Sequence, residues 1–278
     1  MRLIAADGVP DSPARTRPAS RAPWRVAAVQ HRWHADAEQH AEALAEGVAT
    51  AARAGAGLAC LQELTLSPYF AALPDGPSGV DVLPEDPETG PTRSLVTRLA
   101  TTHGIHVSAS LWEADPAVAP RGWNTAICVD PHGRLVARTR KLHIPVTAGY
   151  HEDRYFPPAD LPPDGSAFPV ARVGPAAARV PTRGDQGVPE LPRAYSLARA
   201  QGGVYPPALR SEPDHPGFDT EPLWERVIVG NGIANGTFMV AVNRVGTEQV
   251  RADAPAISFY GSSFISDPYG RVLAQAPR

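Results

Sequence analysis

The stretch WNTAICVDPHGRLVART (residues 123–139) decides the fold, because it holds two apolar runs joined by Asp-Pro-His-Gly. An Asp before a Pro, with Gly two residues after the Pro, suits a type I turn. We therefore predict a β-hairpin with strands at 123–130 and 134–139. The stretch SSFISDPYGRVLAQA (262–276) repeats this design around Asp-Pro-Tyr-Gly. Two hairpins of the same kind indicate a fold with two sheets.

Outward from these hairpins, strand patterns and helix patterns alternate along the chain. RVAAVQH (25–31) and LACL (58–61) are short apolar runs typical of buried strands. Between them Asp36 is a candidate N-cap, apolar residues recur at helical spacing, and Gly55 ends the predicted helix. Further helices are predicted near 91–103, 189–200 and 223–236, and further strands near 105–112, 167–182, 202–206 and 237–244. Strands that alternate with helices predict an α/β layered architecture.

Length and charge narrow the class of protein. The chain has 278 residues, which suits one large α/β domain or two small ones, and no linker divides it. Its 26 Lys and Arg against 29 Asp and Glu give a net charge of −3, which argues against nucleic acid and a membrane surface as partners. No apolar run approaches the roughly 18 residues that span a bilayer. Two cysteines form no disulfide framework, so we predict a reducing, cytoplasmic setting.

The N-terminal stretch differs from the rest in composition. Residues 1–23 are rich in Pro, Arg and Ala and contain no apolar segment of the kind found in a secretory signal. We predict a disordered leader over 1–23 and a single domain over 24–278.

Two polar residues follow predicted strands and are candidates for chemistry. Lys141 is the only lysine, and every other basic residue is an arginine. A lysine offers a compact ammonium that suits an oxyanion, although Lys141 is also explained as a chance survivor of an arginine-rich coding bias. Glu63 closes the apolar run LACL, and α/β folds place chemistry at the carboxyl ends of strands. The alternative is that Glu63 is a solvated loop residue.

Three other motifs are weak. The histidine pairs in HRWH (31–34) and HGIH (103–106) have no acidic or Cys partner at ligand spacing, so we predict surface or strand-edge histidines and no metal site. GNGIANG (230–236) falls within a helical pattern and not after a strand, which argues against a dinucleotide loop. YGSSF (260–264) is not the G-x-S-x-G of a serine hydrolase.

Longer motifs occur in order between residues 25 and 278. They are VAAVQ (26–30), LQEL (61–64), SPYF (67–70), RKLHIP (140–145), GYHEDRYF (149–156), SEPDHPGFD (211–219), VAVNRVG (240–246) and SFYGSSFISDPYGR (258–271). With these motifs the chain resembles the carbon–nitrogen hydrolase (nitrilase) superfamily, particularly the branch of N-carbamoylputrescine amidase and β-ureidopropionase. The resemblance implies a four-layer α-β-β-α sandwich, a small carbamoyl or amide substrate, homo-oligomers, and chemistry without a cofactor or metal.

The resemblance also assigns roles to residues. The family uses a Cys nucleophile, a Glu general base, a Lys that stabilises the tetrahedral intermediate and a second Glu beside them. Glu63, Lys141 and Glu152 match the base, the lysine and the second glutamate. Tyr69, six residues after Glu63, is a candidate to line the pocket or an ordinary packing aromatic.

The nucleophile is the point of departure from the family. The resemblance aligns the cysteine with Arg183 in RGDQGVPE (183–190), and a guanidinium is no nucleophile. Loss of a covalent nucleophile costs on the order of 10⁶ in turnover. Cys60 and Cys128 lie within predicted strands, so we expect small core residues there. Our hypothesis is that Arg183 pairs with one or both glutamates.

Two functions remain open. One is an amidase that cleaves a linear N-carbamoyl amine such as N-carbamoylputrescine and is impaired at Arg183. The other is an inactive family member: a binding or regulatory protein, or a decayed remnant. The chain stops soon after the second hairpin, where the resemblance implies a further strand and an assembly-forming tail. We therefore expect a C-terminal truncation, which weakens the expectation of a homo-oligomer. The acidic groups that would bind a cationic amine cannot be identified in the sequence.

Overall fold

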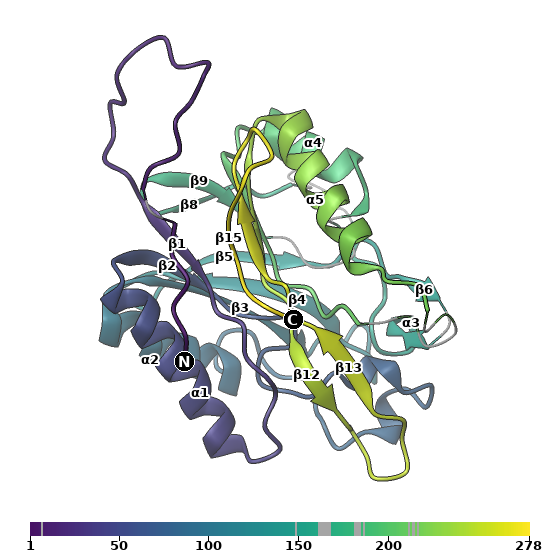
Figure 1. The fold of residues 1–278 in the computed structure, drawn as a ribbon. Helices are drawn as coiled ribbons and strands as arrows, with labels where there is room; N and C mark the ends of the chain where they lie inside the picture. Colours follow the sequence, from purple (N-terminus) through teal and green to yellow (C-terminus); the bar gives the residue numbers. More distant parts are fainter. Residues whose placement is uncertain are drawn as a thin grey trace.

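The computed structural model describes residues 1–6, 8–147, 149–160, 168–180, 185, 187–210, 212, 215 and 217–278. Two large sheets of five and six strands dominate this part of the chain, with two further two-stranded sheets. Figure 1 shows helices α1 and α2 on one side of the strands and α4 and α5 on the other. The predicted four-layer α-β-β-α sandwich is confirmed. Arg183 lies outside the described residues.

The first sheet has the strand order β1-β2-β3-β4-β5. Strands β1, β2 and β3 run parallel, whereas β4 and β5 each run antiparallel to the strand before. The bounds are Arg25–Ala28 (β1), Ala56–Cys60 (β2), His106–Glu113 (β3), Trp123–Val129 (β4) and Leu135–Arg140 (β5). The strands predicted from apolar runs and from the first hairpin are all present.

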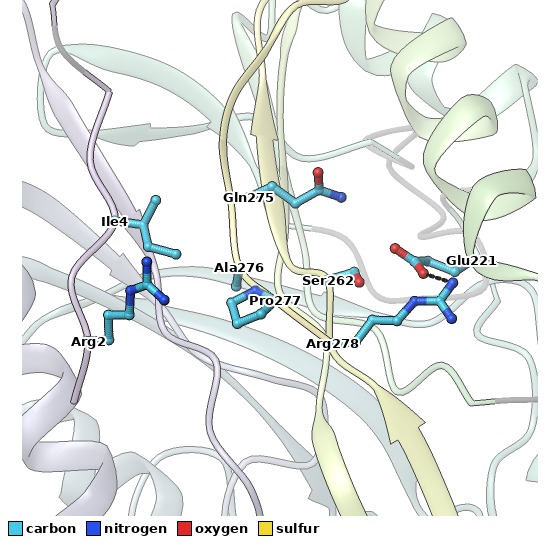
Figure 2. Close-up of a pocket in the computed structure, with 8 residues that line it drawn as sticks. All are labelled: Arg2, Ile4, Glu221, Ser262, Gln275, Ala276, Pro277 and Arg278. Atoms are coloured by element: carbon cyan, nitrogen blue, oxygen red, sulfur yellow. Dashed lines mark ion pairs between the residues drawn. The ribbon is translucent and has the colours of Figure 1, made fainter.

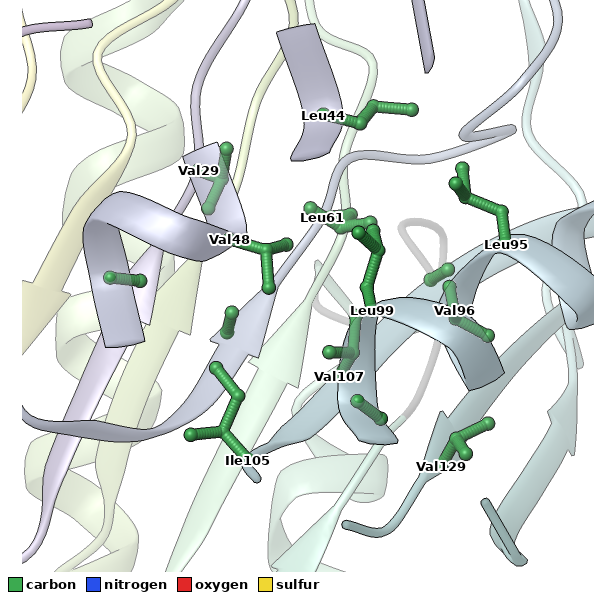
Figure 3. Packing of buried hydrophobic residues seen from close by; sticks show 14 of the residues in the cluster. Val29, Leu44, Val48, Leu61, Leu95, Val96, Leu99, Ile105, Val107 and Val129 are labelled. Atoms are coloured by element: carbon green, nitrogen blue, oxygen red, sulfur yellow. The ribbon is translucent and has the colours of Figure 1, made fainter. Parts of the chain in front are cut away.

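Helices α1 (Ala37–Arg53) and α2 (Pro91–His103) cover the outer face of this sheet. The predicted N-cap is confirmed: the Asp36 side chain accepts a hydrogen bond of 2.8 Å from the backbone N–H of Gln39. Figure 3 shows how apolar side chains of both helices pack with those of the sheet. The labelled members of this core are Val29, Leu44, Val48, Leu61, Leu95, Val96, Leu99, Ile105, Val107 and Val129.

The second sheet has the order β15-β14-β11-β10-β9-β8, in which β9, β10 and β11 are parallel. Its bounds are Ala171–Val173 (β8), Ala176–Arg179 (β9), Gly202–Tyr205 (β10), Phe238–Ala241 (β11), Phe264–Ser266 (β14) and Val272–Gln275 (β15). The helices α4 (Glu190–Leu197) and α5 (Glu221–Asn235) lie on its outer side (Figure 1). Trp224 and Ile228 of α5 pack on Met239 and other outward residues of the strands.

A third apolar core lies between the two sheets. Because side chains alternate along a strand, Leu58 and Cys60 of β2 face this core while Ala59 between them faces the helices. Val204 of β10 and Val240 of β11 face them from the second sheet. The remaining core residues between the sheets are small or β-branched, including Ala126, Cys128, Val173, Ala178, Val180 and Val242. Small side chains allow the sheets to pack closely.

The two predicted hairpins are built in the same way. The carboxylate of Asp130 accepts hydrogen bonds from the backbone N–H groups of His132 and Arg134, and from Nε of Arg134. The carboxylate of Asp267 makes the same set of contacts with Tyr269 and Arg271. The glycine of each turn has positive φ (79° and 80°), which suits glycine. The Asp-Pro-x-Gly-Arg motif thus joins β4 to β5 and β14 to β15.

Several short elements were not predicted. They are the 3₁₀ helices Phe70–Ala72 (η1) and Pro77–Gly79 (η2), the strands Val146–Thr147 (β6), Tyr150–His151 (β7), Val245–Glu248 (β12) and Ile257–Tyr260 (β13), and the helix Glu152–Tyr155 (α3). Strands β12 and β13 form a hairpin of their own outside the two large sheets. No helix of the described residues is both long and apolar enough to cross a bilayer.

Candidate functional site

The candidate residues stand at one edge of the first sheet. Glu63 follows β2, Asn124 lies at the start of β4, and Lys141 directly follows β5. Because β4 is antiparallel to β3 and β5, the end of β2, the start of β4 and the end of β5 share an edge. The backbone N–H of Lys141 donates to the carbonyl of Asn124 at 2.8 Å, which fixes this register.

Lys141 holds the predicted residues together. Its Nζ lies 3.2 Å from Oε1 of Glu63 and also pairs with Oε2 of Glu152, the first residue of α3. All three side chains are fully buried. The hydroxyl of Tyr69 donates to Oε1 of Glu152 at 2.6 Å. The structure therefore brings Glu63, Lys141, Glu152 and Tyr69 into one cluster, which their order in the chain alone does not reveal.

Asn124 is a member of the cluster that sequence reasoning missed. Its Nδ2 donates to Oε1 of Glu63 at 2.8 Å, and its Oδ1 accepts from the Ser110 hydroxyl at 3.3 Å. Oε2 of Glu63 is buried and has no hydrogen-bond partner among the described residues. Glu63 is thus held by one carboxylate oxygen and keeps the other for an incoming proton donor. The only feature of the sequence that could have pointed to Asn124 is its position in β4, the strand that pairs with β5.

The turn after Glu63 is strained and braced. Leu64 has a φ of 48°, a left-handed conformation that bulky residues rarely adopt and that clusters at functional sites. Nη2 of Arg244 donates to the carbonyls of Glu63, Leu64 and Ser67 at 2.9, 2.8 and 2.7 Å. These contacts hold the backbone of the candidate base from the side of the second sheet.

Glu248 completes the brace. Its Oε1 accepts from Nη1 of Arg244 at 2.5 Å, and its Oε2 accepts from the backbone N–H of Tyr69 at 2.9 Å. The Arg244–Glu248 pair is fully buried and therefore holds both ends of the segment from Glu63 to Tyr69. Arg244 lies in the motif VAVNRVG, so the sequence contained it without indicating what it contacts.

The nucleophile position cannot be placed in the same way. Arg183 lies outside the described residues, so its predicted pairing with the glutamates stays a prediction. Asp185, two residues after Arg183 in the chain, is buried. Its Oδ1 accepts a hydrogen bond from the backbone N–H of His143 and lies 3.1 Å from Nδ1 of the His143 ring. Burial raises the pKa of Asp185, against the effect of the His143 contacts.

The two cysteines are fully buried between the sheets. Burial raises the pKa of Cys60 to about 12 and also raises that of Cys128. A thiol that stays protonated and inaccessible does not act as a nucleophile. Both residues are therefore core residues, as expected.

One histidine prediction is wrong. His31 was expected at the surface or at a strand edge but is buried, with its ring 5.0 Å from that of His40 in α1. Burial lowers the pKa of His31 to about 3. His40 contacts the carbonyl of Thr65 at 2.8 Å, so this histidine pair supports the turn after Glu63. No group of His, Cys, Asp or Glu in the described part of the chain is arranged to hold a metal ion, and the predicted lack of a cofactor stays a prediction.

A surface depression of about 400 Å³ lies elsewhere. Figure 2 shows it between the N-terminal segment, the end of the chain and the start of α5. Arg278 pairs with Glu221 across it, and none of the cluster residues lines it. The depression is therefore separate from Glu63 and Lys141.

The arrangement of the cluster suits acyl chemistry. Oε2 of Glu63 can accept a proton from an attacking group, since it is buried and accepts no hydrogen bond from a described residue. The ammonium of Lys141 can offset negative charge on a carbonyl oxygen in this buried site. Glu152 is fixed by Tyr69 and orients the ammonium.

Known proteins resemble this chain over much of its length. The chain is 32% identical to the citrullinase of Francisella tularensis over 91% of this chain and 85% of that protein. It is 35% identical to the N-carbamoylputrescine amidase of Arabidopsis thaliana over 67% of this chain, and the match spans 60% of that protein's length.

Solved structures share the fold. A carbon-nitrogen hydrolase from Helicobacter pylori G27 matches with a TM-score of 0.79 at 26% identity, over 90% of this chain and 84% of that chain. An amidase from Nesterenkonia sp. AN1 matches with a TM-score of 0.69 at 22% identity, over 92% of this chain and 89% of that one, which shows the fold alone. The family model described as carbon-nitrogen hydrolase matches residues 25–278. The chain therefore belongs to the carbon–nitrogen hydrolase family.

Proposed function

We propose that this chain is an amidohydrolase by descent that binds a linear ureido compound at Glu63, Lys141 and Glu152, and whose turnover is impaired because residue 183 is an arginine. The observation that carries the proposal is the buried ammonium of Lys141 between two buried carboxylates, next to an unbonded oxygen of Glu63. Membership in the family supplies the reaction class.

The substrate class is supported by what the relatives share. Citrulline, N-carbamoylputrescine and β-ureidopropionate, the compounds in the names of three relatives, each carry a terminal ureido group. They differ at the far end, which is an amino acid, an amine or a carboxylate. The group R–NH–CO–NH₂ is therefore the common feature, and N-carbamoylputrescine is one candidate of this class.

A cysteine at position 183 would allow hydrolysis of the ureido group in two stages. Glu63 takes the thiol proton, sulfur bonds to the ureido carbon, and Lys141 offsets the charge on the oxygen. The C–N bond breaks, and ammonia leaves with the proton from Glu63. Water then cleaves the thioester, and the released carbamate gives carbon dioxide and an amine. Arg183 cannot perform the first step.

The test is release of ammonia from N-carbamoylputrescine and from citrulline. We expect the unmodified chain to match Glu63→Ala, and the double variant Arg183→Cys/Gly184→Trp to gain on the order of a hundredfold or more, within the ~10⁶ that a covalent nucleophile contributes. The control is Arg193→Cys, which adds a thiol on an exposed part of α4. Turnover by the unmodified chain well above Glu63→Ala would refute the impairment.

The second candidate is a binding or regulatory protein, favoured by Arg183 itself. It predicts that ureido compounds bind to the unmodified chain by calorimetry but that the double variant gains no turnover. If neither binding nor turnover is found in any variant that remains folded, a ureido site is refuted.

A further inference from the structure

A buried arginine, Arg210, packs on the aromatic core around Tyr69 and has no carboxylate partner within the described part of the chain. Arg210 is 6% exposed, and no ion pair joins it to an acidic residue of the described chain. One Nη donates to the carbonyl of Gly149, and the guanidinium lies 4.4 Å from the ring centroid of Tyr150. Its Nε has no hydrogen-bond partner among the described residues. Arg210 is thus a desolvated cation with an unused donor.

Arg210 is linked to the candidate catalytic residues through Phe259 and Tyr69. Its backbone forms a β-bridge with Phe259, whose ring is edge-on to that of Tyr69 at 5.7 Å. Tyr69 in turn donates to Glu152. Tyr150 belongs to the same aromatic core as Tyr69. The guanidinium therefore packs on the same aromatic core that contacts Glu152 through Tyr69.

The segment that carries Arg210 is fixed relative to the candidate base. The side-chain amide of Asn243 accepts from the backbone N–H of Leu209 at 2.7 Å and donates to its carbonyl at 3.1 Å. The next residue, Arg244, holds the carbonyl of Glu63. A ligand that reaches from Glu63 toward Arg210 would contact two side chains whose segments are held in a fixed relative position.

The charges in the neighbourhood differ in their pairing. Lys141 pairs with both Glu63 and Glu152, and Arg244 pairs with Glu248. Arg210 has no such partner among the residues that the structure describes, and burial of an unpaired charge is costly, although stacking on an aromatic ring offsets part of the cost. A carboxylate from a ligand would supply the missing counter-charge through charge-assisted hydrogen bonds.

We propose that Arg210 binds a carboxylate at the far end of the substrate, so that the preferred ligands are linear ureido acids and not ureido amines. This rests on the proposed function, because it takes the ureido group to lie at Glu63 and Lys141. The site then selects anionic ureido compounds, H₂N–CO–NH–(CH₂)n–COO⁻, over cationic compounds of the same length.

The test compares three ligands of matched length on the unmodified chain by calorimetry: a ureido acid, the corresponding ureido amine and the neutral alkylurea. The acid is expected to bind about tenfold or more tightly than the alkylurea, the size of one charge-assisted hydrogen bond, and the amine more weakly than either. A series of acids with two to five methylenes then finds the preferred span.

Variants separate Arg210 from other sources of charge. Arg210→Gln is expected to abolish the preference for the acid while the alkylurea binds as before, and Arg210→Lys to retain part of it. Arg179→Gln is the matched control, since Arg179 is also buried without an ion pair in the described chain but contacts Pro192 and Met239 instead. It should leave the order of the three ligands unchanged.

The outcomes are distinguishable. If Arg210 serves only to stabilise the fold or to balance the cluster's charge from a distance, Arg210→Gln will lower the melting temperature but leave the preference for the acid intact, which overturns the inference. Equal binding of the three ligands also overturns it and leaves the proposed function standing. If no ligand binds, the proposed function fails and the inference fails with it.

Discussion

Lys141 carries its charge where water does not reach. Its ammonium faces Glu63 and Glu152, and none of the three side chains is exposed. A buried ion pair contributes little net stability compared with apolar residues, but removal of one partner is costly because it leaves the others buried and uncompensated. The only lysine of the chain thus occupies a position where it is tightly coupled to two carboxylates.

At this scale we predict that Lys141→Met lowers the free energy of unfolding by about 3–5 kcal/mol, since two carboxylates lose their cation. The measurement is urea unfolding at neutral pH. The matched control is Arg251→Met, which breaks exposed pairs with Asp75 and Asp253 and should cost under about 1 kcal/mol. Similar losses in the two variants would contradict the burial argument.

Residue types and motifs were enough to name Glu63, Lys141 and Glu152 as candidates, because each stands in a recognisable stretch of sequence; the structure brings them together, and their catalytic roles stay a prediction. Asn124 and Arg244 could not be assigned in this way. Asn124 reaches Glu63 only because β4 pairs with its neighbours in one register, and Arg244 comes from the other sheet. Their roles depend on contacts between segments far apart in the chain.

Among the elements, α5 shows how neighbouring glycines differ. An added Cβ at Gly230 would meet nothing within 4 Å, whereas at Gly232 it would lie 2.8 Å from Cγ of Met239 and 3.2 Å from the carbonyl of Thr237. Gly232 therefore allows α5 to approach the second sheet, and Gly230 only lowers helix propensity.

We predict opposite effects for the two alanine variants. Gly230→Ala should stabilise the protein by about 0.5–1 kcal/mol through helix propensity. Gly232→Ala should destabilise it by about 1–3 kcal/mol through overpacking against β11. Thermal unfolding of the pair provides the check, with each variant as the other's control. The reverse order would show that α5 does not pack as described.

Elements with a strong local signal were predicted well. The Asp-Pro-x-Gly-Arg hairpins and the capped helix α1 carry their information within a few residues. The β12–β13 hairpin was missed because its strands have four residues each, and only β13 alternates between buried and more exposed residues whereas β12 does not. Such a hairpin is held by contacts that form only after the sheets have packed.

On the scale of the whole molecule, the candidate site depends on how the two sheets meet. Arg244 follows β11 of the second sheet, and the carbonyls that it holds follow β2 of the first. Two hairpins indicated two sheets, but no sequence signal specified that their edges would share one buried arginine.

We predict that Arg244→Met destabilises the protein by about 3–5 kcal/mol, because Glu248 would be left buried without its partner. The double variant Arg244→Met/Glu248→Gln should recover part of the loss, with a coupling energy of about 0.5–3 kcal/mol in urea unfolding. Arg271→Met is the control: the same four-residue spacing joins Arg271 to Asp267, but Arg271 is 45% exposed, and the buried Asp267 keeps the hydrogen bonds that it accepts from the backbone N–H groups of Tyr269 and Arg271. The control should therefore cost under about 1 kcal/mol. Strict additivity of the two substitutions would show that Arg244 and Glu248 do not stabilise each other.

The two buried cysteines can report how often the core between the sheets opens. Cys60 and Cys128 lie on the face of the first sheet that packs against the second, and neither thiol is exposed. An alkylating reagent can therefore modify them only when the sheets separate, and the modification adds a fixed mass at each thiol. The rate at which that mass appears counts openings of the sandwich in the unmodified chain, without a label or an engineered residue.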